Sequence, residues 1–165
     1  MSDGEKRKQI VRHFMNAAVR SKPPPKQVLD KLHASLEGAL AETVQDNEIK
    51  FVEPRDPGPD DEDNFGSVLV LAGGHLYAIE ASRTQIKVSV IGDLSGGSYS
   101  EASELEDGEV IETTIFYEHP RLEDGAIVLT FPPQDAERYR PIRTRLRVWG
   151  TRTIASPSSE TRPEA

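Results

Sequence analysis

The chain has 165 residues, of which 36% are hydrophobic and 29% charged, and it carries a net charge of −8 and no cysteine. This length fits one domain, or one domain with a short appendage, and is enough to bury a cooperative core. The absence of cysteine excludes disulfides, thiolate catalysis and Cys-ligated zinc. No apolar run approaches the roughly 18 residues of a membrane helix, so we expect no membrane partner and a cytoplasmic location.

Charge is distributed unevenly along the chain. Residues 1–35 carry eight Lys/Arg against three Asp/Glu, residues 36–137 carry five against 23, and residues 138–165 carry seven against two. The three segments therefore have net charges of +5, −18 and +5. Either these segments fold against each other and compensate, or they form a bipolar surface that selects a partner by charge.

The first 46 residues are predicted to form a helical hairpin. Ser2 and Glu5 have the spacing of a capping box, and the helix that they begin is expected to run to about Arg20. The prolines at 23–25 end it, and Pro25 suits the first turn of a second helix that runs to about Val44. Apolar residues recur at helical spacing in both helices: Ile10, Val11, Phe14, Met15, Ala18 and Val19, then Val28, Leu29, Leu32, Leu36, Ala39, Leu40 and Val44.

Residues 47–154 are predicted to form an antiparallel β domain. Short apolar segments, most with alternating polarity, predict strands at residues 49–52, 67–72, 75–80, 85–91, 110–118, 126–131 and 141–149. Gly73-Gly74 predicts a tight hairpin, residues 53–64 an acidic loop, and residues 155–165 a disordered tail. The expected fold class is α+β: the helical hairpin followed by a β-sandwich or barrel of about seven strands.

Motifs for nucleotide, nucleophile and calcium chemistry are missing from the sequence. It contains no Gly-x-Ser-x-Gly elbow, no Walker loop and no dinucleotide fingerprint. Gly96-Gly97-Ser98 lacks the lysine and the following helix of a phosphate cradle, which leaves a plain loop. Counted from Asp60, the twelfth position of a calcium loop is Leu71 and not glutamate. We therefore expect no cofactor.

Histidines and carboxylates offer two weaker alternatives. In an antiparallel helical hairpin His13 and His33 lie level, and Glu37 lies one turn beyond His33, so the three could bind a divalent metal. Half-exposed residues at the edges of the apolar stripes are the ordinary explanation, and we expect no metal site. A small hydrolase built on His and carboxylates stays an alternative, although 28 acidic residues make any carboxylate pair uninformative.

The segment 141–149 has the most specific pattern in the chain. If it is a strand, Ile142, Thr144, Leu146 and Val148 face the core, and Arg143, Arg145, Arg147 and Trp149 form a row on the other face. Arg138 and Arg140 precede this row. Such a row binds phosphates, nucleobases or carboxylates, unless Glu112 and Glu118 of a neighbouring strand neutralise it.

The leading hypothesis for function is a non-enzymatic interaction or assembly module. Its partner is another protein, or a second copy of the chain, bound through apolar helix residues: Phe14, Met15, Leu32, Leu36 and Leu40. The alternative is a nucleic-acid or anionic-ligand binder that uses the arginine row, which the charge of −18 in the middle segment disfavours.

Overall fold

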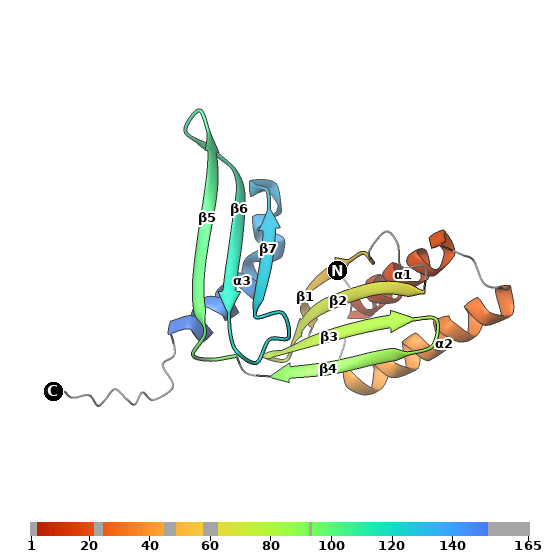
Figure 1. The fold of residues 1–165 in the computed structure, drawn as a ribbon. Coiled ribbons are helices and arrows are strands. Elements are labelled where there is room, and N and C mark those ends of the chain that lie inside the picture. The colour runs from red at the N-terminus through yellow and green to blue at the C-terminus, as the bar shows by residue number, and fades with distance from the viewer. Residues whose placement is uncertain (1–2, 22–24, 45–48, 58–62, 93, 152–165) are drawn as a thin grey trace. The chain divides into compact units, whose positions relative to one another are not determined.

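The computed structural model describes residues 3–21, 25–44, 49–57, 63–92 and 94–151 (Figure 1). Contacts within the chain divide it into two compact units, residues 1–92 and residues 93–165, and each is described by itself. The predicted capping residue Ser2, the acids at 60–62 and the tail 155–165 lie outside the described residues. The predicted division between a helical hairpin, residues 1–46, and a β domain, residues 47–154, stays a prediction.

Two helices and a four-stranded sheet make up the first unit. The helices are α1 (Asp3–Ser21) and α2 (Lys26–Thr43), as predicted, with Pro25 at the N-cap of α2. The strands are β1 (Ile49–Arg55), β2 (Asn64–Ala72), β3 (His75–Ser82) and β4 (Ile86–Gly92), all antiparallel, in the order β1-β2-β3-β4. The predicted Gly73-Gly74 hairpin is confirmed, because both glycines have the positive φ that a two-residue turn requires.

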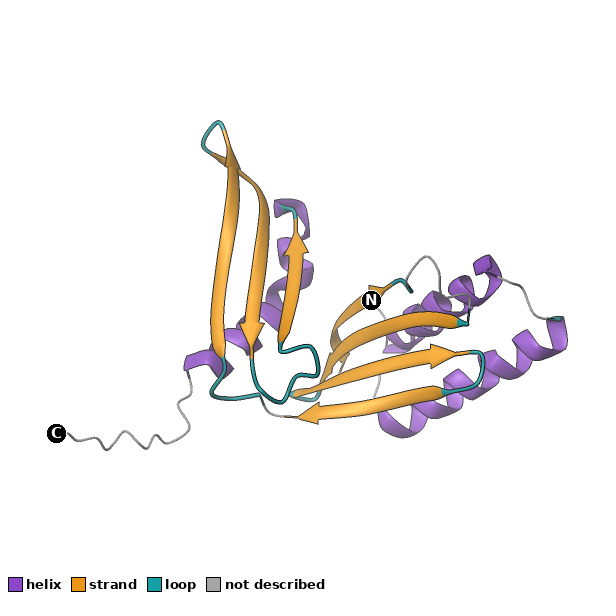
Figure 2. Cartoon of the chain, viewed as in Figure 1, coloured by secondary structure: helices purple, strands orange, loops and turns teal. Residues whose placement is uncertain are grey.

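The core of the first unit lies between the two helices and one face of this sheet (Figure 2). Alternation along each strand turns every second side chain toward the helices. The buried apolar side chains come from both layers: Ile10, Val11, Phe14, Ala17, Ala18, Leu36, Leu40 and Val44 from the helical segment, and Ile49, Val52, Phe65, Val68, Val70, Ala72, Ile79 and Ala81 from the strands.

A three-stranded antiparallel sheet and one helix make up the second unit. The strands β5 (Ser98–Glu106), β6 (Glu109–Glu118) and β7 (Ala126–Phe131) lie in chain order, and η2 (Pro133–Asp135) leads into α3 (Ala136–Thr151). Tyr139, Ile142, Leu146 and Trp149 are the buried residues of α3, at the spacing of one helical face. The ring of Tyr139 stacks on that of Phe131, with centroids 4.5 Å apart.

The β5–β6 hairpin is longer than the rest of its sheet. Because β7 pairs only with residues 113–118 of β6, residues 104–112 extend past β7 as a two-stranded projection, here called the prong (Figure 1). Asp107 and Gly108 form its turn, both with positive φ, and the register shifts between Glu104 and Leu105.

The α+β class, the two N-terminal helices and the seven antiparallel strands are confirmed, but two details of the prediction are wrong. The strands form separate sheets of four and three strands and not a closed barrel. The predicted last strand, residues 141–149, is part of α3, and the seventh strand is instead β5, which the polar sequence at 98–106 did not suggest.

Candidate interaction surface

The arginines of α3 do not form the predicted row. A strand places Arg143, Arg145 and Arg147 on one face, whereas successive helix positions turn by about 100°. Trp149, predicted beside them on the exposed face, is 1% exposed and packs in the core. The apolar residues of segment 141–149 fit both the period of two of a strand and the period of 3.6 of a helix. Arg and Leu favour helix over strand, and η2 leads the chain directly into α3.

One carboxylate on β5 neutralises two of these arginines. The Nε and Nη2 atoms of Arg143 donate to the Oε1 and Oε2 atoms of Glu101 at 3.0 and 2.6 Å. Nη2 of Arg147 donates to the same two oxygens at 3.2 and 3.3 Å, and the Tyr99 hydroxyl donates to Oε1. The partner is thus Glu101, and not Glu112 or Glu118 as the sequence suggested.

The electrostatics of this cluster follow from its hydrogen bonds. The bonds from Arg143 lower the pKa of the Glu101 carboxyl to about 2, against the opposing effect of burial, and Tyr99 and Arg147 add to the lowering. Burial and the neighbouring carboxylate raise the pKa of Tyr99. A carboxylate held ionised by two guanidinium groups stabilises the contact of α3 with β5, and the arginines that hold it are not available as a ligand row.

The other arginines of α3 are engaged separately. Arg140 pairs with Glu137 on the exposed side of the helix. The guanidinium carbon of Arg138 lies 4.7 Å from the ring centroid of Tyr139, and that of Arg145 lies 5.8 Å from the ring centroid of Trp149. The predicted row on a strand face is therefore not formed.

The helix residues proposed for partner binding are used within the first unit. Phe14, Leu36 and Leu40 are buried in its core, and Met15 and Leu32 are partly buried against the same core. The two helices therefore bury most of their apolar stripes on their own sheet, while Val19 and Val28 stay 49% exposed.

Of the three residues of the candidate metal site, His13 has a different contact from the other two. Nε2 of His13 lies 3.1 Å from the carbonyl oxygen of Arg55, while Nδ1 of His33 lies 3.4 Å from Oε1 of Glu37. Within the described residues no group of three His, Cys, Asp or Glu side chains has a geometry that could hold a metal ion.

Glu118 at the end of β6 and His119 in the loop that follows line one depression of about 370 Å³, together with Gly96, Gly97 and Ser98. His119 is buried there, and backbone groups occupy both of its ring nitrogens. Arg121 N donates to Nδ1 at 3.0 Å, and Nε2 lies 3.1 Å from the carbonyl oxygen of Ser95. An imidazole with both nitrogens engaged by backbone orders the loop and has no nitrogen left to accept a proton from a substrate.

Apart from Val148 on α3, the exposed large apolar side chains among the described residues of the second unit lie on its sheet. Phe116 is 36% exposed and Val128 is 47% exposed, and they are direct cross-strand partners on the face that points away from α3. Seven residues form this open face: Ser100, Ala102, Thr114, Phe116, Ala126, Val128 and Thr130. The hydroxyls of Thr114 and Thr130 lie 3.1 Å apart on it.

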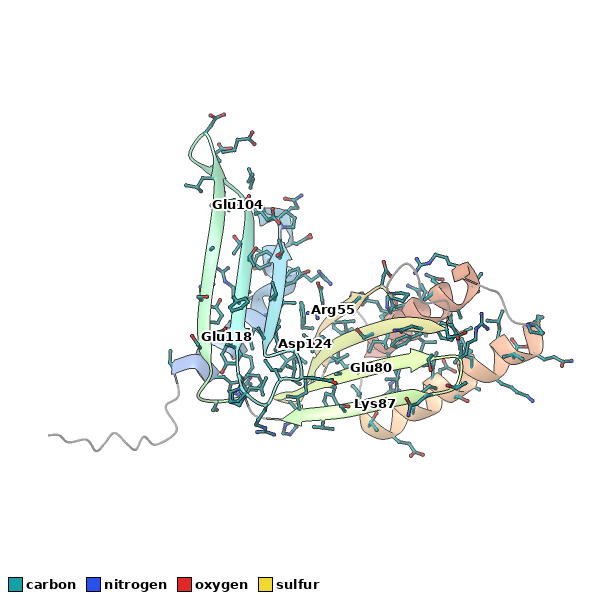
Figure 3. The ribbon with its side chains drawn as sticks, in the orientation of Figure 1. Arg55, Glu80, Lys87, Glu104, Glu118 and Asp124 are labelled. Carbon is teal, nitrogen blue, oxygen red and sulfur yellow. The ribbon has the colours of Figure 1, made fainter. Side chains whose placement is uncertain are left out.

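Carboxylates border the open face at both ends. Glu118 lies at one end of the open face and Glu104 at the other (Figure 3). Glu112 lies directly opposite Glu104 across the strands. Beyond them the prong adds three exposed apolar side chains, Leu105 at 62%, Val110 at 42% and Ile111 at 44%. The signal for this surface was present in the sequence, because β6 and β7 carry apolar residues at both parities, and such a strand has more apolar side chains than one covered face can bury.

Comparison of the chain with protein-family models, with curated proteins and with solved structures finds no match. Among the described residues, no helix has the length and apolar character that crossing a membrane requires.

Proposed function

We propose that the protein is a non-enzymatic interaction module that binds another protein through the open face. The observation that carries the proposal is the pairing of Phe116 with Val128 on the sheet face opposite α3, where both side chains are substantially exposed. Contiguous apolar surface with a polar rim is typical of protein-binding sites, since its burial is favourable at about 25 cal/mol per Å².

The composition of the open face supports this proposal. Small residues, Ser100 and Ala102 on β5 and Ala126 on β7, surround the two larger apolar side chains, so a partner side chain can lie beside Phe116 without steric conflict. Apart from Ala102 and Ala126, the residues around the apolar pair are hydroxyl-bearing or acidic, which corresponds to the polar rim of a protein interface. We also propose that the module acts in the cytoplasm, the location expected from the sequence analysis.

Site-specific photo-crosslinking tests the proposal. A benzophenone amino acid at position 116, introduced in the cells that make the protein, is expected to yield one covalent adduct of defined mass. The same amino acid at position 148 is the control, because Val148 on α3 is also exposed, at 39%.

A second substitution shows whether an adduct depends on the open face. Val128→Ser is expected to lower the yield from position 116 about tenfold, as truncation of a central interface residue does, whereas Val148→Ser leaves it unchanged. Equal yields from positions 116 and 148, or an adduct that survives Val128→Ser, would refute the assignment. A cross-link within the chain, which leaves its mass unchanged, would refute it as well.

A further inference from the structure

The charged side chains in the sheet of the second unit are all acidic. Its three strands carry six glutamates and neither Lys nor Arg, and Asp107 adds a seventh carboxylate in the prong turn. Among the described residues, Glu101 alone of the six has arginine partners, and it lies on the face that α3 covers. Within the described part of the chain, the structure records no ion pair for the other five.

Two pairs of these glutamates face each other directly across the hairpin. Glu104 lies opposite Glu112, and Glu106 lies opposite Glu109. Like charges at directly opposed positions of an antiparallel pair destabilise it, and both pairs occur in the part of the hairpin without support from β7. The free protein therefore carries electrostatic repulsion at the border of the open face. Residues that destabilise the element in which they lie, as these opposed glutamates do, are expected at functional sites.

We infer that the occupant of the open face is a cationic segment of another protein, in which Lys or Arg residues flank an apolar side chain. This inference rests on the proposed function and names the chemistry of the partner. The apolar side chain packs against Phe116 and Val128, while the cations reach Glu118 at one end and Glu104 with Glu112 at the other. Such cations replace repulsion by attraction and also speed the encounter at low salt.

The same charges disfavour two other occupants. A second copy that presents its own open face brings the bordering glutamates of both copies together, and a nucleic acid brings phosphates to them. Of the chemistries considered, only a cationic polypeptide satisfies both the apolar centre and the acidic border.

A synthetic probe tests the inference on the full-length chain. The probe is a short fluorescent peptide of alternating Lys and Leu, and its counterpart of alternating Glu and Leu is the negative control. Fluorescence anisotropy is expected to show binding of the Lys-Leu peptide alone, with an affinity that falls as salt rises from about 50 to 300 mM.

Two triple variants separate the location of the charges from their total. Three exposed ion pairs together are worth about a tenfold change in affinity, so Glu104→Gln, Glu112→Gln and Glu118→Gln combined should weaken binding of the Lys-Leu peptide about tenfold. Glu5→Gln, Glu42→Gln and Glu80→Gln combined remove the same charge from exposed positions of the first unit and should leave it unchanged.

The outcomes distinguish this inference from the proposed function. Equal weakening in the two triple variants, or no weakening in either, would overturn the inference. If the photo-adduct at position 116 forms and keeps its yield in the first triple variant, the open face binds a partner that is not cationic, and only the inference falls. An adduct at twice the mass of the chain would identify a second copy and overturn it too. If no adduct forms, the proposed function falls and the inference with it.

Discussion

Replacing Glu101 by glutamine removes the charge that holds α3 to β5 and keeps the shape of the side chain. In the folded protein this carboxylate accepts hydrogen bonds from Arg143, Arg147 and Tyr99. Glutamine retains an acceptor oxygen but leaves both guanidinium groups without a counter-charge, so we expect the second unit to lose stability.

The size of the loss follows from the pKa of the carboxyl. The hydrogen bonds from Arg143 lower it from 4.5 to about 2, and at about 1.4 kcal/mol per pKa unit this corresponds to roughly 3 kcal/mol. Arg147 is half exposed, so solvent screens part of its field, and we expect a loss of about 2 kcal/mol at pH 7. Because the folded-state pKa is depressed, this contribution is complete above pH 4.5 and disappears as the pH falls through about 2.

Urea unfolding followed by tryptophan fluorescence measures this difference. Trp149 is the only tryptophan and lies in the core of the second unit, so its emission reports that unit. The free energies of unfolding of the wild-type protein and of Glu101→Gln are expected to differ by about 2 kcal/mol at pH 7 and to converge as the pH approaches 2. Glu137→Gln, which breaks the exposed pair with Arg140, is the control and should cost less than about 0.5 kcal/mol. A difference at pH 7 as small as that of the control, or one that stays constant between pH 5 and 2, would refute the reasoning.

Two further predictions concern stability, and circular dichroism in urea measures both. Gly97→Ala should lower the free energy of unfolding by about 1–3 kcal/mol, because a Cβ atom there would lie 2.6 Å from Cζ of Tyr117. Gly38→Ala has nothing within 4 Å of its Cβ atom and should stabilise α2 by about 0.5–1 kcal/mol. Equal effects of the two substitutions would contradict the packing argument. Glu106→Lys should raise stability by about 0.5–1 kcal/mol, because it turns the repulsion with Glu109 into attraction, and an unchanged or lower stability would show that this repulsion is not felt in the free protein.

The first unit was largely predictable from the sequence because its signals are local. The proline run in the sequence predicts where one helix ends and the next begins, and apolar residues at helical spacing mark the helix faces that the core buries. Gly73 and Gly74 supply the turn between two clearly apolar strands. In each case, the residues that define an element lie within it, so no knowledge of a distant partner is needed.

The second unit was harder to predict because its elements depend on each other. The segment from Ile142 to Trp149 satisfies both a period of two and a helical period, and packing of Ile142, Leu146 and Trp149 in one core selects the helix. β5 is built mostly from serine, glutamate and alanine, which give it a low strand propensity, and it is a strand because β6 pairs with it along its length.

The sequence by itself determined the α+β class, the two N-terminal helices and the segregation of charge along the chain. It also determined that β6 and β7 carry apolar residues on both faces. Tertiary structure alone decided which charges meet. The arginines near the end of the chain find their carboxylate at Glu101, about 40 residues earlier, and the glutamates of the prong are brought opposite each other by pairing. The physical reason is that periodicity and propensity act over a few residues, whereas an ion pair or a cross-strand contact depends on where distant parts of the chain pack.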